Sequence, residues 1–124
     1  MHSNSDATKL TGIDLWGIGE WYDMYQAFSG FTNVTSTATD QPRFIGQINC
    51  GFMFLNATHF NGDLSNWDMS NVVGFDGLFW GASAFNSDIG NWNVSSVRRM
   101  NNMFEGAASF NQNLGAWDVS SVTN

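Results

Sequence analysis

Apolar and polar positions alternate in a fixed pattern that recurs along the second half of the chain. The segments SNWDMSNV, GNWNVSSV and GAWDVSSV occupy residues 65–72, 90–97 and 115–122, so the interval between successive segments is constant. Together with the apolar residue just before each segment, Leu64, Ile89 or Leu114, their apolar positions follow L-x-x-L-x-L-x-x-V, the spacing of a leucine-rich repeat. From the tryptophan onward, apolar and polar residues alternate, which predicts a short β-strand with one apolar face. In the second segment this strand covers about Trp92 to Ser95.

A second pattern follows each of these segments. Val97, Met100, Met103, Phe104 and Ala107 recur at intervals of three and four, which predicts about two helical turns with one apolar face. Ser95 or Ser96 could cap this helix, and Gly106 could end it. A Phe-Asn pair then returns the chain to the next strand. Equivalent positions at the same interval include Phe60, Phe85 and Phe110, Asn61, Asn86 and Asn111, and Phe54, Phe79 and Phe104.

The repeat predicts one domain built from stacked units of about 25 residues. We expect an α/β repeat solenoid over residues 10–124, a leucine-rich-repeat-like right-handed coil with short parallel strands on one face and short helices on the other. Its units, numbered one to five, start near residues 16, 42, 67, 92 and 117, and the last is incomplete. We expect residues 1–9 to form a polar tail. A single unit encloses too little apolar surface to fold alone, so stacking must create the core.

Composition narrows the classes of function. The chain has 124 residues, 43% of them hydrophobic, with 11 Phe and 6 Trp, which indicates a folded domain. A formal charge of -7 disfavours nucleic acid and anionic membranes as partners. No apolar run reaches the length of a membrane span, and the first residues lack the pattern of a signal peptide. One cysteine allows neither an internal disulfide nor a cysteine-based zinc site.

No set of residues suggests catalysis. His59 lies beside Phe60 in an expected turn, and Cys50 takes a position that is apolar in later units, so both are interpreted as structural. We therefore expect no enzyme activity, no cofactor and no metal. One alternative stays open, because Asp63, Asp88 and Asn113 form a row of oxygen donors that could hold calcium.

Polar residues beside the tryptophans form the candidate binding face. They share an exposed row on the predicted strands, and they are Asn66, Asp68, Asn91, Asn93 and Asp118. A binding stripe and a solubilising row with hydrogen bonds between units are both compatible with this pattern. Residues Trp117, Asp118, Val119 and Ser120 are a candidate self-association edge, because the predicted fifth strand has no neighbour on one side.

Two further rows have structural interpretations. The tryptophans Trp67, Trp92 and Trp117 occupy the central apolar position and should face the interior rather than stack on sugars. The asparagines Asn61, Asn86 and Asn111 should bond turn backbone that would otherwise be unpaired.

The repeat resembles that of the BspA-like leucine-rich-repeat surface proteins, which includes repeats found in mycoplasma lipoproteins. The resemblance rests on W-D-[VM]-S-x-V, then M-F or L-F, then G-A-x-x-F-N, clearly over residues 42–124 and weakly over 10–41. It implies a cell-surface or secreted protein that binds host or neighbouring-cell components.

The function expected from these features is a non-enzymatic scaffold for protein or glycan binding, adhesion-like in character. The alternative is a structural protein that assembles end to end, or as a homodimer, through its C-terminal coil. A small-ligand or enzymatic role comes third, because regular stacking tends to leave no pocket.

Overall fold

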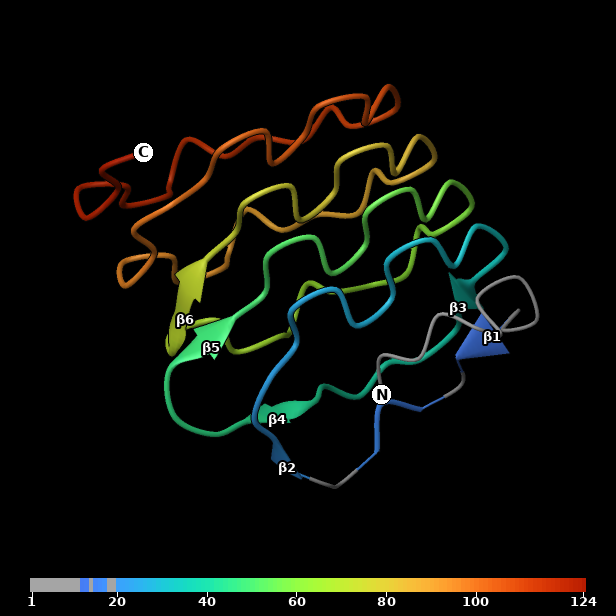
Figure 1. Cartoon of the computed structure of the whole chain (residues 1–124), viewed down its shortest axis with the longest axis horizontal. Helices are drawn as coiled ribbons and strands as arrows, with labels where there is room; N and C mark the ends of the chain where they lie inside the picture. Colours follow the sequence, from blue (N-terminus) through green and yellow to red (C-terminus); the bar gives the residue numbers. More distant parts are fainter. Residues whose placement is uncertain (1–11, 14, 18–19) are drawn as a thin grey trace.

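Short parallel strands are the regular secondary structure of this protein. The computed structural model describes residues 12–13, 15–17 and 20–124, so the predicted tail at residues 1–9 lies outside the described part. Three parallel pairs form, β1 (Gly12–Ile13) with β3 (Thr35–Ser36), β2 (Glu20–Trp21) with β4 (Arg43–Phe44), and β5 (Ile48–Asn49) with β6 (Val72–Gly74) (Figure 1). An isolated parallel bridge joins Gly74 to Arg99. The prediction of short parallel strands in a small repeat-like fold is confirmed.

No strand lies at Trp67, Trp92 or Trp117, where the sequence placed one, whereas β4 lies at the predicted position near residue 42. The chain around Trp92 contains turns instead, and the Oδ1 of Asn93 accepts a hydrogen bond from the N–H of Ser95 at 3.1 Å. Asp68 and Asp118 make the same bond to the residue two places later. These side-chain oxygens take backbone donors that a strand ladder would use.

The predicted helices are absent from the described residues. Consecutive turns replace them, as at Met53, Leu55 and Ala57, whose N–H groups each donate to the carbonyl three residues earlier. The N–H groups of the intervening Phe54 and Asn56 donate instead to carbonyls of the next unit, at 3.0 and 2.7 Å. Along this segment, N–H groups that donate within their own unit therefore alternate with N–H groups that donate to the next unit.

Left-handed backbone explains why a helix cannot form there. In unit three, Gly77 has φ +57° and Gly81 has φ +74°. The same two positions in unit four, Asn102 and Gly106, have φ +58° and +72°. A residue with positive φ at the third position of a turn is the geometry of a type II turn, and it interrupts an α-helix. The apolar spacing of three and four thus came from successive turns.

The core consists of phenylalanine columns that run across the units. Phe28, Phe54, Phe79 and Phe104 stack with ring centroids 5.5, 5.7 and 5.9 Å apart. A second column, Phe60, Phe85 and Phe110, has spacings of 6.1 and 5.8 Å. The two columns contact each other, with Phe79 and Phe85 only 3.9 Å apart. Equivalent residues of units three and four therefore lie against one another, and Figure 1 shows these units as neighbouring rows.

The tryptophan row is interior, as predicted. Trp67 and Trp92 are each 4% exposed, and Trp117 is half-buried. Trp92 stacks on Trp117 at 6.4 Å, and its Nε1 donates to the carbonyl of Leu64 at 2.8 Å. Trp67 has a different neighbour: it meets the ring of Trp16 edge-on, with the ring centroids 4.9 Å apart. The Nε1 of Trp67 makes no hydrogen bond with the described residues.

The regular register is lost between units one and three. Trp21 pairs with Phe44, although the alignment of Trp16 with Pro42 placed Trp21 opposite Gln47. Further along, Ile48 pairs with Val72 and Asn49 with Gly74, so a bulge lies in this pair. Unit two therefore carries extra backbone between Phe44 and Ile48.

Candidate functional site

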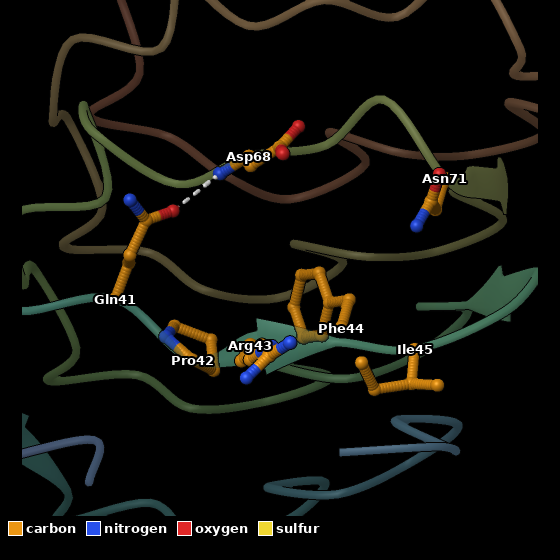
Figure 2. Close-up of a pocket in the computed structure, with 7 residues that line it drawn as sticks. All are labelled: Gln41, Pro42, Arg43, Phe44, Ile45, Asp68 and Asn71. Carbon is orange, nitrogen blue, oxygen red and sulfur yellow. Dashed lines mark hydrogen bonds between the residues drawn. The ribbon is translucent and has the colours of Figure 1, made fainter. Parts of the chain in front are cut away.

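An open groove lies beside this irregular part of unit two. It has a volume of about 500 Å³, and it is lined by Gln41, Pro42, Arg43, Phe44, Ile45, Asp68 and Asn71. Figure 2 shows the residues of unit two along one side and Asp68 and Asn71 along the other. The lining combines cationic, anionic, amide and apolar groups.

The groove results from the mismatch in register. Strand β4 is paired with β2 on the side away from unit three, and β5 resumes pairing with β6 only at Ile48. Over residues 45–47 the chain follows a wide loop between these two strands (Figure 1). A bulged or irregular strand often marks a binding site, because it alters the direction of nearby side chains.

Side-chain contacts hold the two sides of the groove together. The Oε1 of Gln41 accepts a hydrogen bond from the N–H of Asp68 at 2.8 Å (Figure 2). Below them lies Phe44, which is 8% exposed. Its ring packs against that of Trp67, with the ring centroids 5.7 Å apart. Arg43 lies 3.8 Å from Glu20, and both side chains are largely exposed, so this ion pair contributes little stability and leaves the guanidinium available.

The groove contains one residue of the predicted binding face, Asp68. Its Oδ1 accepts hydrogen bonds from both the N–H and the hydroxyl of Ser70, at 3.0 and 2.6 Å. The hydroxyl and N–H of Ser70 lower the pKa of this carboxyl group, because both stabilise its charged form. Asp68 therefore remains an anion in the groove at neutral pH.

The other predicted face residues are exposed but do not gather in one cavity. Asn93 and Asp118 close turns as Asp68 does, and the Nδ2 of Asn66 donates to the carbonyl of Thr39 at 3.0 Å. Asn91 lines a separate hollow of about 300 Å³ beside Asp88 and Gln112. Three of these five side chains therefore close turns within their own unit rather than bonding between units, whereas the side chain of Asn66 bonds to a neighbouring unit.

The acidic members of these rows predict a pH effect. Hydrogen bonds from Ser65, Ser70 and Ser120 lower the pKa values of Asp63, Asp68 and Asp118 in the folded protein. Their stabilising contribution is present above the unfolded pKa of about 4 and is lost as the pH falls through the lower folded values. In the triple variant Asp63→Asn, Asp68→Asn, Asp118→Asn, melting curves from pH 7 to pH 2 should therefore show a smaller acid-induced fall in Tm.

Asn93 provides the reciprocal control, because it fills the same position without a charge. The variant Asn93→Asp should steepen the loss of Tm with acid. If the triple variant and the parent lose equal stability between pH 5 and pH 2, the turn carboxylates are not coupled to folding.

The row proposed for calcium also closes turns. Asp63, Asp88 and Asn113 each accept, through Oδ1, the N–H of the residue two places later, at 2.8 to 2.9 Å. Within the described part of the chain, no three His, Cys, Asp or Glu side chains are grouped closely enough to hold a metal ion.

The asparagine row forms a ladder between units. The Oδ1 of Asn61 accepts the N–H of Asn86, and the Oδ1 of Asn86 accepts the N–H of Asn111, both at 2.8 Å. Gln112 joins this ladder, since its Nε2 donates to the backbone carbonyl of Asn86 at 2.8 Å. The amides therefore bond backbone, as predicted, although that backbone belongs to the next unit.

Replacing Asn86 tests the ladder. Asn86→Leu removes the acceptor for the N–H of Asn111 and should lower the free energy of unfolding by about 1–2 kcal/mol. Urea unfolding monitored by circular dichroism measures this loss. Asn111→Leu is the matched control, because its Oδ1 accepts no hydrogen bond within the described residues and its loss should be smaller. Equal unfolding midpoints for Asn86→Leu and the parent would contradict the role.

The predicted self-association edge is not a strand. Trp117 is half-buried on Trp92, Asp118 and Ser120 close a turn, and Val119 is 49% exposed. The backbone that does pair lies further on, where the N–H of Thr123 donates to the carbonyl of Arg98 at 2.9 Å.

Cys50 and His59 have the structural positions expected for them. Cys50 is fully buried, and burial raises the pKa of its thiol well above the usual value, so the thiol stays protonated. The Nδ1 of His59 lies 2.7 Å from the carbonyl oxygen of Thr32, on the exposed surface.

The sequence interpretation missed Gln41, Arg43 and Asn71 as site residues. The available signal was the break in the repeat, with Pro42 at a tryptophan position and an irregular spacing around it.

Comparison with known proteins places the chain in a family. Residues 22–124 match DUF285, described as a Mycoplasma protein of unknown function, and the chain belongs to this family. No curated protein and no solved structure gives a match. Among the described residues, no helix is long and apolar enough to cross a membrane.

Proposed function

We propose that the protein is a non-enzymatic repeat scaffold that binds a protein or glycan ligand in the groove between units two and three. The observation that carries this proposal is the groove itself, which lies where the repeat register is interrupted and holds Arg43, Asp68 and Asn71 together with the apolar residues Pro42, Phe44 and Ile45. Concave sites with a few polar groups on an apolar base are typical of ligand binding.

The scaffold is inferred to be a leucine-rich-repeat-like solenoid. Support comes from N–H groups that donate to carbonyls of the next unit and from phenylalanine rings that stack on their equivalents there. In such an architecture each unit contacts only its neighbours, and the sides offer extended surfaces for binding. The resemblance to BspA-like surface proteins supports an adhesion role at the cell surface or outside the cell.

Binding is tested with arrays of glycans and of extracellular-matrix proteins probed with the whole chain. Asn71→Trp should block the groove and abolish a signal that the parent gives. Ser121→Trp is the matched control, because Ser121 is the equivalent position two units later and is exposed outside the groove. A signal that survives Asn71→Trp would exclude the groove as the binding site.

A second candidate function, end-to-end assembly, is favoured by the exposed face of the last units. Phe104, Phe110 and Trp117 are only half-buried, whereas their equivalents one unit earlier, Phe79, Phe85 and Trp92, are no more than 4% exposed. This face would be covered by one further unit in the same register.

The backbone at this face indicates which surface could cover it. The N–H groups of Asn102, Phe104 and Gly106 make no hydrogen bond with described residues, whereas their equivalents in unit three donate to unit four. The edge therefore offers donors and needs carbonyl acceptors. Two copies meeting face to face would oppose donors to donors, so head-to-tail growth fits better than a closed dimer.

Light scattering against concentration tests this alternative. Head-to-tail assembly should give a mean mass that keeps rising, and Phe104→Asp should prevent the rise by placing a charge on the apolar face. A constant monomer mass up to millimolar concentration would exclude assembly by the 124-residue chain.

A further inference from the structure

Three aromatic side chains form a row on the surface across units one to three. Tyr25 lies 5.8 Å from Phe52, and Phe52 lies 6.4 Å from Trp80, measured between ring centroids. Tyr25 is 43% exposed, Trp80 is 36% exposed and Phe52 is partly exposed. We call these three residues the aromatic row, and none of them lines the groove.

The repeat does not require aromatic residues at these positions. Units three and four have Asp76 and Asn101 where unit two has Gly51 and unit one has Tyr25. The position of Trp80 is held by Ser29 in unit one and by Glu105 in unit four. The buried phenylalanines, in contrast, recur in every one of these units, so the aromatic row is an addition to the core pattern.

Phe52 occupies its position under backbone strain. Its φ is +56°, and the same left-handed position is held by Gln26, Gly77 and Asn102 in the other units. A bulky residue in this conformation is an outlier, and strained residues of this kind are concentrated at functional sites. The ring lies over Gly77, where a Cβ would collide with it. Phe52 is not fully buried, so core packing gives no full explanation for the strain.

The backbone of an acidic residue lies near each end of the aromatic row, and at the Tyr25 end the carboxylate itself makes the contact. The Oδ1 of Asp23 accepts the N–H of Tyr25 at 3.0 Å, and the backbone carbonyl of Glu105 accepts the N–H of Gly81, next to Trp80, at 2.7 Å. Among the described residues, neither Asp23 nor Glu105 forms an ion pair. The whole chain has 11 acidic and 4 basic side chains, so the surrounding field attracts cations.

We propose that the aromatic row binds arginine or lysine side chains of a basic segment in a partner protein. Aromatic faces attract guanidinium and ammonium groups, tryptophan most strongly, and the carboxylate of Asp23 and the net charge of -7 add charge complementarity. This surface is separate from the groove, and the inference does not depend on the groove having a ligand.

An arginine–glycine octapeptide, Arg and Gly alternating, is the probe. Its affinity for the parent chain is measured by fluorescence polarisation at physiological salt, where weak surface attraction is screened. Phe52→Asn and Trp80→Ser introduce the residues that other units carry at these positions, and neither changes the net charge. Each should weaken binding at least tenfold. Phe52→Asn should leave Tm unchanged or raise it, because it relieves the backbone strain.

The controls separate this inference from the proposed function and from general charge attraction. Asn71→Trp, which blocks the groove, should leave peptide affinity within twofold of the parent. Equal affinity of the parent, Phe52→Asn and Trp80→Ser would overturn the proposal and assign the binding to net charge. Binding of a neutral oligosaccharide such as cellohexaose that both variants abolish, with no effect on the peptide, would overturn it in favour of a glycan.

Discussion

Phe79→Ala is expected to lower the free energy of unfolding by about 3–5 kcal/mol, the loss typical of a fully buried phenylalanine. Phe79 is 0% exposed, and its ring stacks at 5.7 Å on Phe54, at 3.9 Å on Phe85 and at 5.9 Å on Phe104. The variant would leave a cavity where the two phenylalanine columns meet. Urea denaturation followed by fluorescence measures the loss.

Phe104→Ala is the matched control for Phe79→Ala. Phe104 continues the same column one unit later, but it is only half-buried, with Phe79 on one side and Phe110 beside it at 4.3 Å. Because the Phe104 side chain buries less apolar area on folding, Phe104→Ala should lower the free energy of unfolding by about 1–2 kcal/mol. Similar losses in the two variants would show that the face of unit four is covered in solution.

The repeat register was predictable in units three and four because it depends on side-chain size. Phe79, Met103 and Trp92 are buried as the repeat spacing requires, and rings of the same kind meet across units. Burial of apolar area is non-directional, so the recurrence of large apolar residues identifies the core without knowledge of the backbone conformation.

The helices were wrong because apolar intervals of three and four do not distinguish a helix from consecutive turns. The information that does distinguish them lies in residues that tolerate positive φ. Gly77 and Asn102 share one such position, and Asn56, Gly81 and Gly106 share another four residues later. Glycine and asparagine at both positions are a turn signal, whereas the interpretation of Gly106 used it only as a helix terminator.

The groove could not be predicted because it depends on a mismatch between units rather than on the repeat. Pro42 marked unit two as divergent, but the position of the extra backbone follows from pairings such as Trp21 with Phe44 and Ile48 with Val72. The sequence showed the acids beside the tryptophans as a row. Asp68 alone lies in the groove, because its neighbour is the irregular unit two. The hydrogen bond by which Asp68 closes a turn with Ser70 is a local feature, because aspartate side chains often accept the backbone N–H two residues later. The sequence alone contained the information needed to expect it.

Gly81→Ala is expected to be more destabilising than Gly106→Ala, although both glycines have nearly the same backbone conformation, φ +74° and +72°. An alanine in left-handed backbone costs about 1–2 kcal/mol, which both variants share. At Gly81 the added Cβ would also collide with the Oδ1 of Asn56 and meet its Cα at 3.4 Å, whereas at Gly106 the nearest atoms lie at an ordinary 3.5 Å. Overpacking should add about 1–3 kcal/mol at Gly81 alone.

Urea unfolding of the two alanine variants measures the difference directly. The double variant Asn56→Gly, Gly81→Ala removes the colliding side chain and keeps a residue that tolerates the φ of +57° at position 56. Its loss should fall to that of Gly106→Ala. Parent-like stability in Gly81→Ala and Gly106→Ala would mean that these turns do not hold positive φ, and the chain would then be free to form the helices that its apolar spacing predicted.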